Sequence, residues 1–268
     1  MSENKLIRLI EILKDMENAV LAYSGGVDSS FLLKALKLSG IRVLAVTAAS
    51  EITPPNDVLL AKSMAEELGI EHRIIQTQEL LMEDFVRNTP ERCFFCKEER
   101  FKKITYLASA EQYQFVLDGS NVDDAEDYRP GKKAAAKYLV RSPLEEVRCS
   151  KKEIREFSRQ LGLSTWNRPS SPCLATRFPY GHSITRKALK RVEQAEEFLR
   201  NFGFNEIRVR DHGDMARIEV HEDKIELLLV PEKRKVITEK LRNIGYMFIS
   251  LDLEGYRSGS MNRVLRNG

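Results

Sequence analysis

The sequence predicts an α/β protein, in which a doubly wound parallel sheet is followed by a small C-terminal α+β domain. Three observations support this prediction. Short apolar runs alternate with helical patterns through the first half of the chain, a glycine- and serine-rich turn joins the first run to the next helix, and a proline-rich segment precedes a shorter mixed region. Parallel strands need crossover helices between them, so the alternation favours helices on both faces of the sheet.

The elements of the main sheet follow in chain order. Strands are expected in the apolar runs AVLAYS (19–24), IRVLAVT (41–47), EHRIIQT (71–77) and QFVLDGS (114–120). Helices are expected at 29–39, at 55–69, in a stretch ending at about residue 111, and at 151–162. Such sheets bind ligands beyond the carboxyl ends of their strands. The candidate binding loops therefore follow Tyr23, Thr47, Gln76 and Leu117.

A second, smaller domain is predicted beyond a boundary near residue 180. The segment WNRPSSPCLATRFPYGHS is rich in Pro and Ser, which is typical of a loop or linker. It is followed by a helical pattern at 185–204, strand-like EIRVR and ARIEV, a helical pattern at about 222–243, and the run YMFISLDL. We therefore expect an α/β domain at 1–180 and a small domain at 181–268 for substrate binding or oligomerisation.

Composition limits the partners. With 268 residues, 42% of them hydrophobic, the chain can bury one large core or two modest ones. It has 43 basic and 40 acidic residues, a net charge of +3, so no strong field attracts nucleic acid. The amino-terminal stretch mixes charges with apolar residues, as an amphipathic helix does and an export signal does not, and no run reaches the roughly 18 apolar residues of a membrane span. Four cysteines in such a chain favour a reducing, cytoplasmic location.

The turn SGGVDSS combines the features of an anion site. A helix that starts directly after a strand offers unpaired backbone N–H groups and the positive end of its dipole. Gly25 and Gly26 let the backbone approach a phosphate closely, and the serines add hydroxyl donors. Asp28 would repel phosphates unless a cation lay between them, which indicates Mg²⁺. For the fragment S-x-x-D alone, a simple helix N-cap is the alternative.

The whole string resembles the signature of the PP-loop ATP pyrophosphatases, which split ATP between its α and β phosphates and adenylate a substrate. The stretch lacks both G-x-x-x-x-G-K-[ST] and G-x-G-x-x-G, so Walker-type NTPases and dehydrogenases are not expected. The resemblance assigns ATP binding to Ser24, Gly25, Gly26, Val27, Asp28 and Ser29.

Two later loops suit an adenylating site. Thr47 and Ala48 end the second strand and could face adenine. The segment DGSNVDDAEDYRPG places Asn121, Asp124 and Arg129 where ribose, Mg²⁺ or pyrophosphate would lie. A solvated acidic loop is the alternative interpretation of this segment.

The cysteines form a separate pattern. Cys93 and Cys96 have C-x-x-C spacing at the expected start of a helix, where thiolates are favoured, and Cys173 lies in the proline-rich segment. A structural zinc site usually takes two such pairs, and no second pair is present. Three thiolates on a 4Fe-4S cluster would leave one iron open for chemistry. Cys149 is expected to be structural.

With these residues in view, the chain resembles the LarE family of ATP-dependent sulfur transferases. The similarity is carried by SGGVDSS, DGSNVDDAEDYRPG, VRSPL with the lysine-containing helix after it, CLATRFPYG and GFNEIRVRDHGDMARIEV. The resemblance implies a small nucleotide substrate, pyridinium-3,5-biscarboxylic acid mononucleotide, whose carboxylates become thiocarboxylates of the nickel-pincer nucleotide cofactor. It also implies a homo-oligomer.

The resemblance further implies where the sulfur comes from. In some members the cysteine matching Cys173 is a sacrificial donor that is left as dehydroalanine. Members that also carry the pair matching Cys93 and Cys96 resemble a second type, which holds a 4Fe-4S cluster. This chain has all three cysteines, so a cluster on Cys93, Cys96 and Cys173 is expected, with sacrifice of Cys173 as the runner-up.

Adenylation explains why ATP is needed. The substrate carboxylate would attack the α-phosphate, with Mg²⁺ near Asp28 neutralising the leaving pyrophosphate, because AMP leaves a carboxyl carbon far more readily than oxide does. We expect Asp28 and Cys173 to be the catalytic residues.

Arginines are candidates for binding the phosphate of the substrate. Arg208 and Arg210 alternate along EIRVR, so both lie on one face of a strand. Together with Arg177 and Arg217 they could bind phosphate through their guanidinium forks. An exposed strand face with solvated arginines is the alternative.

Three rival functions remain at this stage. A tRNA-thiolating PP-loop enzyme would share the three cysteines, but the near-neutral charge and the lack of an evident RNA-binding module count against it. Other PP-loop amidotransferases or synthetases leave the cysteines unexplained. A non-catalytic ATP-binding module needs only the glycine turn.

Overall fold

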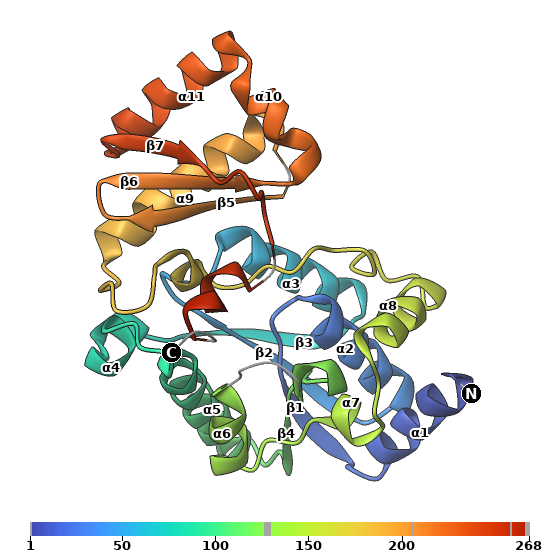
Figure 1. Cartoon of the computed structure of the whole chain (residues 1–268). Helices are drawn as coiled ribbons and strands as arrows, with labels where there is room; N and C mark the ends of the chain where they lie inside the picture. Colours follow the sequence, from blue (N-terminus) through green and yellow to red (C-terminus); the bar gives the residue numbers. More distant parts are fainter. Residues whose placement is uncertain (1, 126–129, 205, 258, 266–268) are drawn as a thin grey trace. The chain divides into compact units, whose positions relative to one another are not determined.

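The computed structural model describes residues 2–125, 130–204, 206–257 and 259–265 (Figure 1). The chain forms two compact units. The first comprises Met1–Glu79 and Cys93–Ser171, and the second comprises Leu80–Arg92 and Pro172–Gly268. The second unit therefore begins before residue 180 and includes an internal segment that the sequence places in the first domain. The limits 1–180 and 181–268 stay a prediction about independent domains.

The first unit contains a four-stranded parallel sheet in the order β3-β2-β1-β4, which confirms the predicted fold class (Figure 1). Its strands are β1 (Asn18–Ala22), β2 (Arg42–Ala49), β3 (Glu71–Gln76) and β4 (Phe115–Leu117). Its helices are α1 (Ser2–Lys14), α2 (Val27–Ser39), α3 (Pro55–Glu67), α5 (Arg92–Ala110, whose first residue is counted in the second unit), α6 (Gly131–Lys137), α7 (Pro143–Glu146) and α8 (Lys151–Gln160).

Two apolar cores cover the two faces of this sheet. Side chains alternate between faces along β1, so Ala19 and Leu21 point to one core and Val20 to the other. The first core includes residues of α1, α2, α3 and α8, and the second includes residues of α5 and α6. The strands β1 and β2 are buried on both faces over most of their length and are near-continuous apolar runs in the sequence, whereas the edge strand β3 is more polar and partly exposed.

The strand order places a topological switch point in the first unit. From β1 the chain moves outward to β2 and β3, and then returns to the other side of β1 as β4. Loops after β1 and β4 therefore leave the sheet as neighbours, at the position where α/β proteins commonly bind ligands. The glycine-serine turn and the segment starting at Asp118 are these two loops.

The second unit is built on a three-stranded sheet in the order β5-β6-β7. The strands β5 (Ile207–His212) and β6 (Met215–Val220) form an antiparallel hairpin, and β7 (Phe248–Leu251) runs parallel to β6. The helices are α4 (Glu83–Val86), α9 (Arg186–Asn201), α10 (Ile225–Leu229) and α11 (Pro231–Ile244). Residues of α9, α10 and α11 share one apolar core with the sheet.

The helix predicted at 222–243 is interrupted in the structure. A 3-10 turn at Glu222–Lys224 leads into α10, and α11 starts anew at Pro231. Proline lacks an N–H and disfavours helical geometry in the residue before it, so Val230 is extended, with ψ of 125°. The apolar periodicity survives this break, which is why the sequence alone shows one helix.

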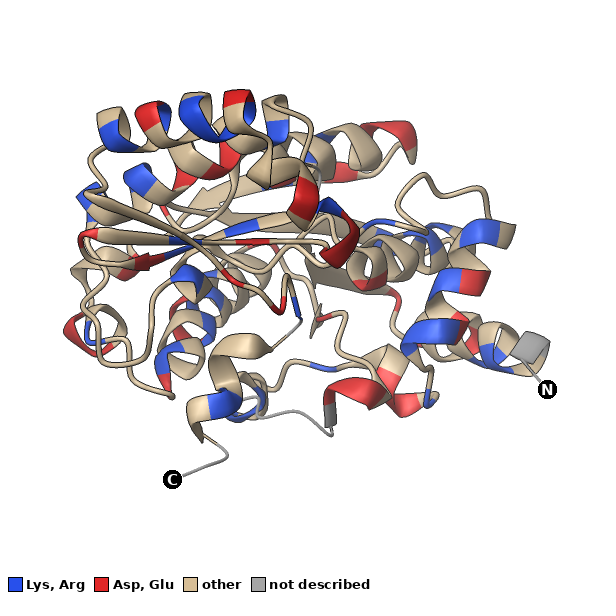
Figure 2. Ribbon diagram, turned by 45° about the horizontal axis from the view of Figure 1, so that its top comes forward, with Lys and Arg blue, Asp and Glu red and all other residues tan. Residues whose placement is uncertain are grey.

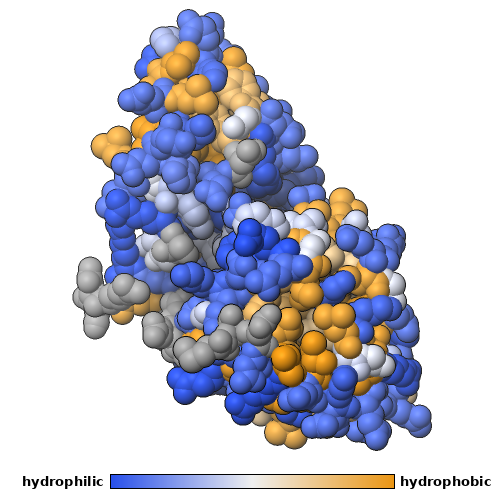
Figure 3. All heavy atoms as spheres, turned by 90° about the vertical axis from the view of Figure 1, so that its right-hand side faces the viewer, coloured by the Kyte–Doolittle hydropathy of each residue, from blue (hydrophilic) through white to orange (hydrophobic). Residues whose placement is uncertain are grey.

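The surface is mixed in character. Lys and Arg alternate with Asp and Glu along the helices (Figure 2), and on the face drawn in Figure 3 hydrophobic residues form small groups among hydrophilic ones. Among the described helices, none combines the length and apolar character needed to cross a membrane.

Candidate active site

The turn after β1 is shaped by close backbone packing. Gly25 has a φ of +70°, and a Cβ at this position would lie 2.9 Å from the Cβ of Ala61 on α3. Gly26 is the N-cap residue of α2 and offers no side-chain cap to the helix. The hydroxyls of Ser24 and Ser29 lie 3.1 Å apart beside this first turn. Backbone N–H groups and hydroxyls thus converge where the sequence predicts a phosphate.

Asp28 in the first turn of α2 forms an ion pair with Lys151, the first residue of α8. The backbone N–H of Lys151 donates to Asp123 at 2.6 Å. A capping box of Ser150 and Glu153 fixes the start of α8. The ammonium group of Lys151 therefore lies beside the carboxylate that is predicted to meet Mg²⁺. The sequence analysis did not single out this lysine, and only the S-x-x-E pattern at Ser150 locates it in a first turn.

The loop after β4 approaches the same helix start. A Cβ at Gly119 would lie 3.0 Å from the backbone nitrogen of Ser29, a contact tighter than nearly all real Cβ contacts, so a side chain here would push the loop away from α2. Asn121 is buried and its side-chain oxygen accepts from the N–H of Asp123 at 3.0 Å. The carboxylate of Asp124 accepts from the N–H of Asn121 at 3.2 Å. Asn121 and Asp124 thus belong to one loop at the switch point, whereas Arg129 lies outside the described residues.

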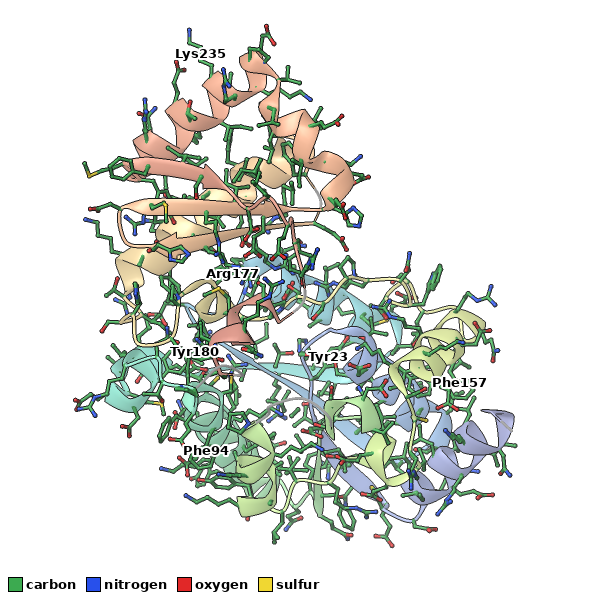
Figure 4. All side chains as sticks on the ribbon, viewed as in Figure 1. Tyr23, Phe94, Phe157, Arg177, Tyr180 and Lys235 are labelled. Carbon is green, nitrogen blue, oxygen red and sulfur yellow. The ribbon has the colours of Figure 1, made fainter. Side chains whose placement is uncertain are left out.

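Thr47, near the carboxyl end of the inner strand β2, is hydrogen-bonded to neighbouring residues of the first unit. Its hydroxyl donates to the carbonyl oxygen of Tyr23 at 2.8 Å and lies 2.8 Å from Nε2 of His72. Burial lowers the pKa of His72, which favours the neutral ring. Tyr23 lies at the end of β1 (Figure 4), and Ala48 is 9% exposed. The adenine contact assigned to Thr47 and Ala48 stays a prediction.

A second cation contacts the glycine turn. Arg168 donates to the carbonyl oxygen of Gly25 at 2.8 Å and to Asp57 of α3 at 2.7 Å. It therefore links the turn to the helix that packs against Gly25. No sequence pattern indicates this role, because Arg168 lies in the proline-rich segment.

The C-x-x-C pair lies at the start of α5, as predicted. Cys93 is exposed and Cys96 is partly exposed. The thiol of Cys96 lies 3.6 Å from a carboxylate oxygen of the buried Glu79. Burial alone would raise the pKa of Glu79, but the guanidinium of Arg100 and several hydrogen bonds lower it below its usual value. Glu79 is therefore an ionised neighbour of Cys96 that the sequence analysis did not single out.

Cys149 contrasts with this pair. It is fully buried, and burial raises the pKa of its thiol to about 11. A protonated, inaccessible thiol neither attacks electrophiles nor ligates metals. These properties support the structural role expected for Cys149.

In the second unit, Cys173 is partly exposed and its backbone is held by Arg177. The guanidinium of Arg177 donates to the carbonyl oxygens of Pro172 at 2.9 Å and Cys173 at 3.3 Å. The same group binds both carboxylate oxygens of Glu196 at 2.8 and 2.9 Å. Arg177, which is labelled in Figure 4, and Glu196 are both buried, so this pair anchors the cysteine-bearing segment to α9.

The remaining arginines line the sheet of the second unit. Ile207 and Val209 lie in the apolar core, and the intervening Arg208 and Arg210 point to the other face of β5, as strand alternation requires. Both arginines are nevertheless buried, at 8% and 4% exposed, which does not match a solvated strand face.

Buried carboxylates hold this arginine face together. Glu219 on β6 accepts from Arg210 at 2.6 Å and from Arg217 at 3.1 Å. The guanidinium of Arg208 lies 4.7 Å from the ring centre of Tyr256. Burial and the neighbouring Arg177 lower the pKa of Arg208, so positive charge is crowded here. The sequence analysis missed Glu196 and Glu219, although the alternation in ARIEV already places Glu219 on the face of Arg217.

The donor atoms present fit the groups that the sequence implies. Asp28 and the serine hydroxyls are hard oxygen donors suited to Mg²⁺, and three accessible thiols that form no disulfide suit an iron-sulfur cluster. Among the described residues, no group of three or more His, Cys, Asp or Glu side chains is already arranged as a metal site.

Comparison with known proteins gives matches over nearly the full chain. A family model described as NAD synthase matches residues 7–117. An uncharacterized protein of Synechocystis sp. is 41% identical over 266 residues, 99% of both chains. The pyridinium-3,5-bisthiocarboxylic acid mononucleotide synthase of Lactiplantibacillus plantarum is 38% identical over 264 residues, 97% of this chain and 95% of its own. An uncharacterized protein of Methanocaldococcus jannaschii is 32% identical over 95% of this chain and 98% of its own.

Proposed function

Because this chain belongs to the LarE family of PP-loop, ATP-dependent enzymes, we propose that it converts the carboxylates of pyridinium-3,5-biscarboxylic acid mononucleotide into thiocarboxylates. The chain is an enzyme, and ATP is its activating substrate. The observation that carries the proposal is the convergence of the SGGVDSS turn and the Gly119 loop on the first turn of α2.

ATP binding is assigned to the first unit. The N–H groups at Gly26 to Ser29 and the hydroxyls of Ser24 and Ser29 would bind phosphate oxygens. Asp28 would hold Mg²⁺, which bridges carboxylate and phosphate oxygens. Asn121, Asp124 and Arg129 are assigned to the ribose or pyrophosphate side, and Thr47 and Ala48 to adenine.

We also assign Lys151 to the ATP site, because it forms an ion pair with Asp28. Its ammonium group balances the charge of the Asp28 carboxylate beside the predicted anion site. If Asp28 held Mg²⁺, the ammonium of Lys151 would lie close enough to the same site to stabilise the leaving pyrophosphate, whose charge grows during adenylation.

Substrate binding is assigned to the arginine face of the second unit. Burial and the neighbouring Arg177 lower the pKa of Arg208, and a phosphate dianion near this side chain would stabilise its charged form. Arg177, Arg210 and Arg217 would contribute further positive charge, held in place by Glu196 and Glu219. Preorganised guanidinium groups lose little entropy when a phosphate arrives.

Sulfur delivery is assigned to Cys93, Cys96 and Cys173. A 4Fe-4S cluster on three thiolates would supply an iron with an open position for sulfur. The chain itself would supply the three accessible thiols. Cys149 is buried and therefore takes no part in binding the cluster. In the runner-up route, the thiolate of Cys173 attacks the acyl-adenylate and AMP leaves. Loss of the Cα proton of residue 173 to a base, with cleavage of the Cβ–S bond, then gives thiocarboxylate and dehydroalanine.

Product analysis tests the proposed function. The full chain with ATP, Mg²⁺ and the biscarboxylate mononucleotide should release AMP and pyrophosphate only when the mononucleotide is present. Release of ADP and phosphate would contradict adenylation. Release of AMP that requires tRNA, with binding that weakens steeply as salt rises, would favour the tRNA-thiolating rival instead.

The two sulfur routes differ in what they leave behind. Anaerobic purification followed by iron and sulfide analysis should give a cluster-loaded protein with visible absorption. Intact mass spectrometry after turnover should then show an unchanged chain. Loss of the mass of hydrogen sulfide at Cys173, without bound iron, would establish the sacrificial route.

A further inference from the structure

A short chain of hydrogen bonds ends at the residue before the glycine turn. Tyr23, labelled in Figure 4, directly follows β1, and its main-chain carbonyl oxygen accepts from the hydroxyl of Thr47 at 2.8 Å. The same hydroxyl oxygen lies 2.8 Å from Nε2 of His72 on β3. The strands β3, β2 and β1 are neighbours in the sheet, so the chain runs across the carboxyl half of the first unit's sheet toward the turn.

The last member of this chain fixes the direction of donation. A carbonyl oxygen only accepts, so the single hydroxyl proton of Thr47 is donated to Tyr23. The oxygen of Thr47 must then accept from His72, which requires a proton on Nε2 of the imidazole. His72 is therefore the donor that starts the chain.

Tyr23 is held by three further contacts. Its N–H donates to the carbonyl oxygen of Val46 at 2.8 Å, its phenol oxygen lies 3.2 Å from the hydroxyl of Ser30 on α2, and its ring packs edge-on against His72, with ring centres 5.9 Å apart. Tyr23 and Thr47 are only 2% and 3% exposed. A buried carbonyl that loses its donor has no water to replace it, so the hydroxyl of Thr47 is needed where it lies.

The peptide group after Tyr23 connects this chain to the candidate phosphate site. A peptide unit is planar, so a fixed carbonyl at Tyr23 also fixes the orientation of the N–H of Ser24. A carbonyl that accepts a hydrogen bond polarises its amide, which makes the N–H a stronger donor. The hydroxyl of Ser24, beside that of Ser29, is assigned to phosphate oxygens.

We propose that His72 is a positioning residue for the ATP site and acts through the hydroxyl of Thr47 on the peptide group before Ser24. The inference rests on the proposed binding of ATP phosphates at the glycine turn. It requires no contact between His72 and the nucleotide. The effect of His72 should therefore appear in the affinity for ATP, depend on a donor at the place of Nε2, and vanish when residue 47 has no hydroxyl.

Nucleotide binding without turnover tests this role. Calorimetric titration of the full chain with Mg²⁺ and the α,β-methylene analogue of ATP, which cannot be cleaved between its α and β phosphates, gives the Kd. His72→Ala should raise the Kd about fivefold, because a hydrogen bond that holds a buried group is lost. His72→Gln should bind like the wild type, since its amide nitrogen lies as many bonds from Cβ as Nε2 does. His72→Asn is one bond shorter and should bind as weakly as His72→Ala.

A second pair of variants tests the route through Thr47. Thr47→Val has a similar shape but no hydroxyl, so it should also raise the Kd. Adding His72→Ala to Thr47→Val should cause no further increase, because the imidazole then has no hydroxyl to act through. His221→Ala is the control for loss of an imidazole, because His221 is exposed and its partner Asp223 is exposed as well, and its Kd should equal that of the wild type. Thermal unfolding verifies that each variant is folded at the temperature of the titration.

Three results would overturn the inference. One is an equal Kd for the wild type and His72→Ala. Another is binding by His72→Gln as weak as that by His72→Ala, which would mean that the imidazole acts by packing and not by donation. The third is a further loss of affinity when His72→Ala is added to Thr47→Val. Failure of the proposed function has a different signature, since the wild-type protein would then bind the analogue, with the expected order among the variants, but release no AMP in the presence of the mononucleotide.

Discussion

Single residues define the charge of the candidate ATP site. Asp28 and Lys151 lie far apart in the sequence but form an ion pair at the start of α2. Both side chains are partly exposed, so the pair itself adds little to stability. Its importance lies in the charge presented to a nucleotide.

Lys151→Ala should raise the KM for ATP about tenfold, because it removes a charged hydrogen-bond donor from the phosphate site. Steady-state kinetics of pyrophosphate release would measure this. Lys152→Ala is the matched control, since Lys152 is the next residue and is exposed. Equal KM values for the two variants would remove Lys151 from the site.

Arg208→Ala should raise the KM for the mononucleotide about tenfold and leave the KM for ATP unchanged, because the substrate phosphate would lose a buried guanidinium. Arg234→Ala on the exposed surface of α11 is the control. Initial rates at varied concentrations of each substrate separate the two constants. A selective increase for ATP would contradict the assignment.

Cys149 makes the stability of the protein depend on pH. Because burial raises its thiol pKa from 9.0 to about 11, the unfolded chain releases this proton at lower pH than the folded chain does. The stabilisation is complete below pH 9 and is lost as pH rises toward 11, a change of about 2–3 kcal/mol. Urea unfolding of the wild type and Cys149→Ala between pH 8 and about 11 would show their difference shrink. A difference that stays constant over this range would contradict the assigned pKa.

At the scale of elements, the site depends on how closely two loops approach one helix. The turn after β1 and the loop after β4 meet at the start of α2, where Gly25 and Gly119 leave no room for a side chain. Neither glycine contributes chemistry. Both allow backbone N–H groups to remain at the surface that a phosphate would contact.

Gly119→Ala should lower both stability, by about 1–3 kcal/mol, and ATP affinity, because its methyl group would lie 3.0 Å from the nitrogen of Ser29. Gly40→Ala is a useful comparison. Gly40 has a φ of +75° but open space around it, so only a backbone cost of about 1 kcal/mol is expected, with unchanged ATP affinity. Thermal unfolding and nucleotide titration would distinguish the two variants.

These elements also show what sequence patterns can predict. The parallel sheet, the glycine turn and the helix start at Cys93 follow from local periodicity and turn chemistry. Lys151 at Asp28 and Arg168 at Gly25 do not, because each contact joins residues more than a hundred positions apart. The break at Val230 was missed because apolar periodicity continues across Pro231.

At the scale of the whole molecule, the two units are not consecutive in the chain. Leu80–Arg92 belongs to the second unit, so the chain passes between units after Glu79, after Arg92 and after Ser171. Predicting this from sequence would require knowing that Asn88 and Arg92 bind carbonyl groups near residue 180. Nothing in the composition of residues 80–92 distinguishes them from their neighbours.

Because the chain passes between the units three times, we expect the protein to stay assembled after a single cut between them. A single cut between Ser171 and Pro172 yields two fragments. The first contains Leu80–Arg92, and the second contains the residues of the second unit against which this segment packs. A denaturing gel should show two bands, while native mass spectrometry should show one intact particle. Dissociation of the nicked particle under native conditions would contradict this expectation. The segment Leu80–Arg92 should thus hold the two fragments together, so that cutting the backbone in the proline-rich segment does not by itself release the carboxy-terminal fragment.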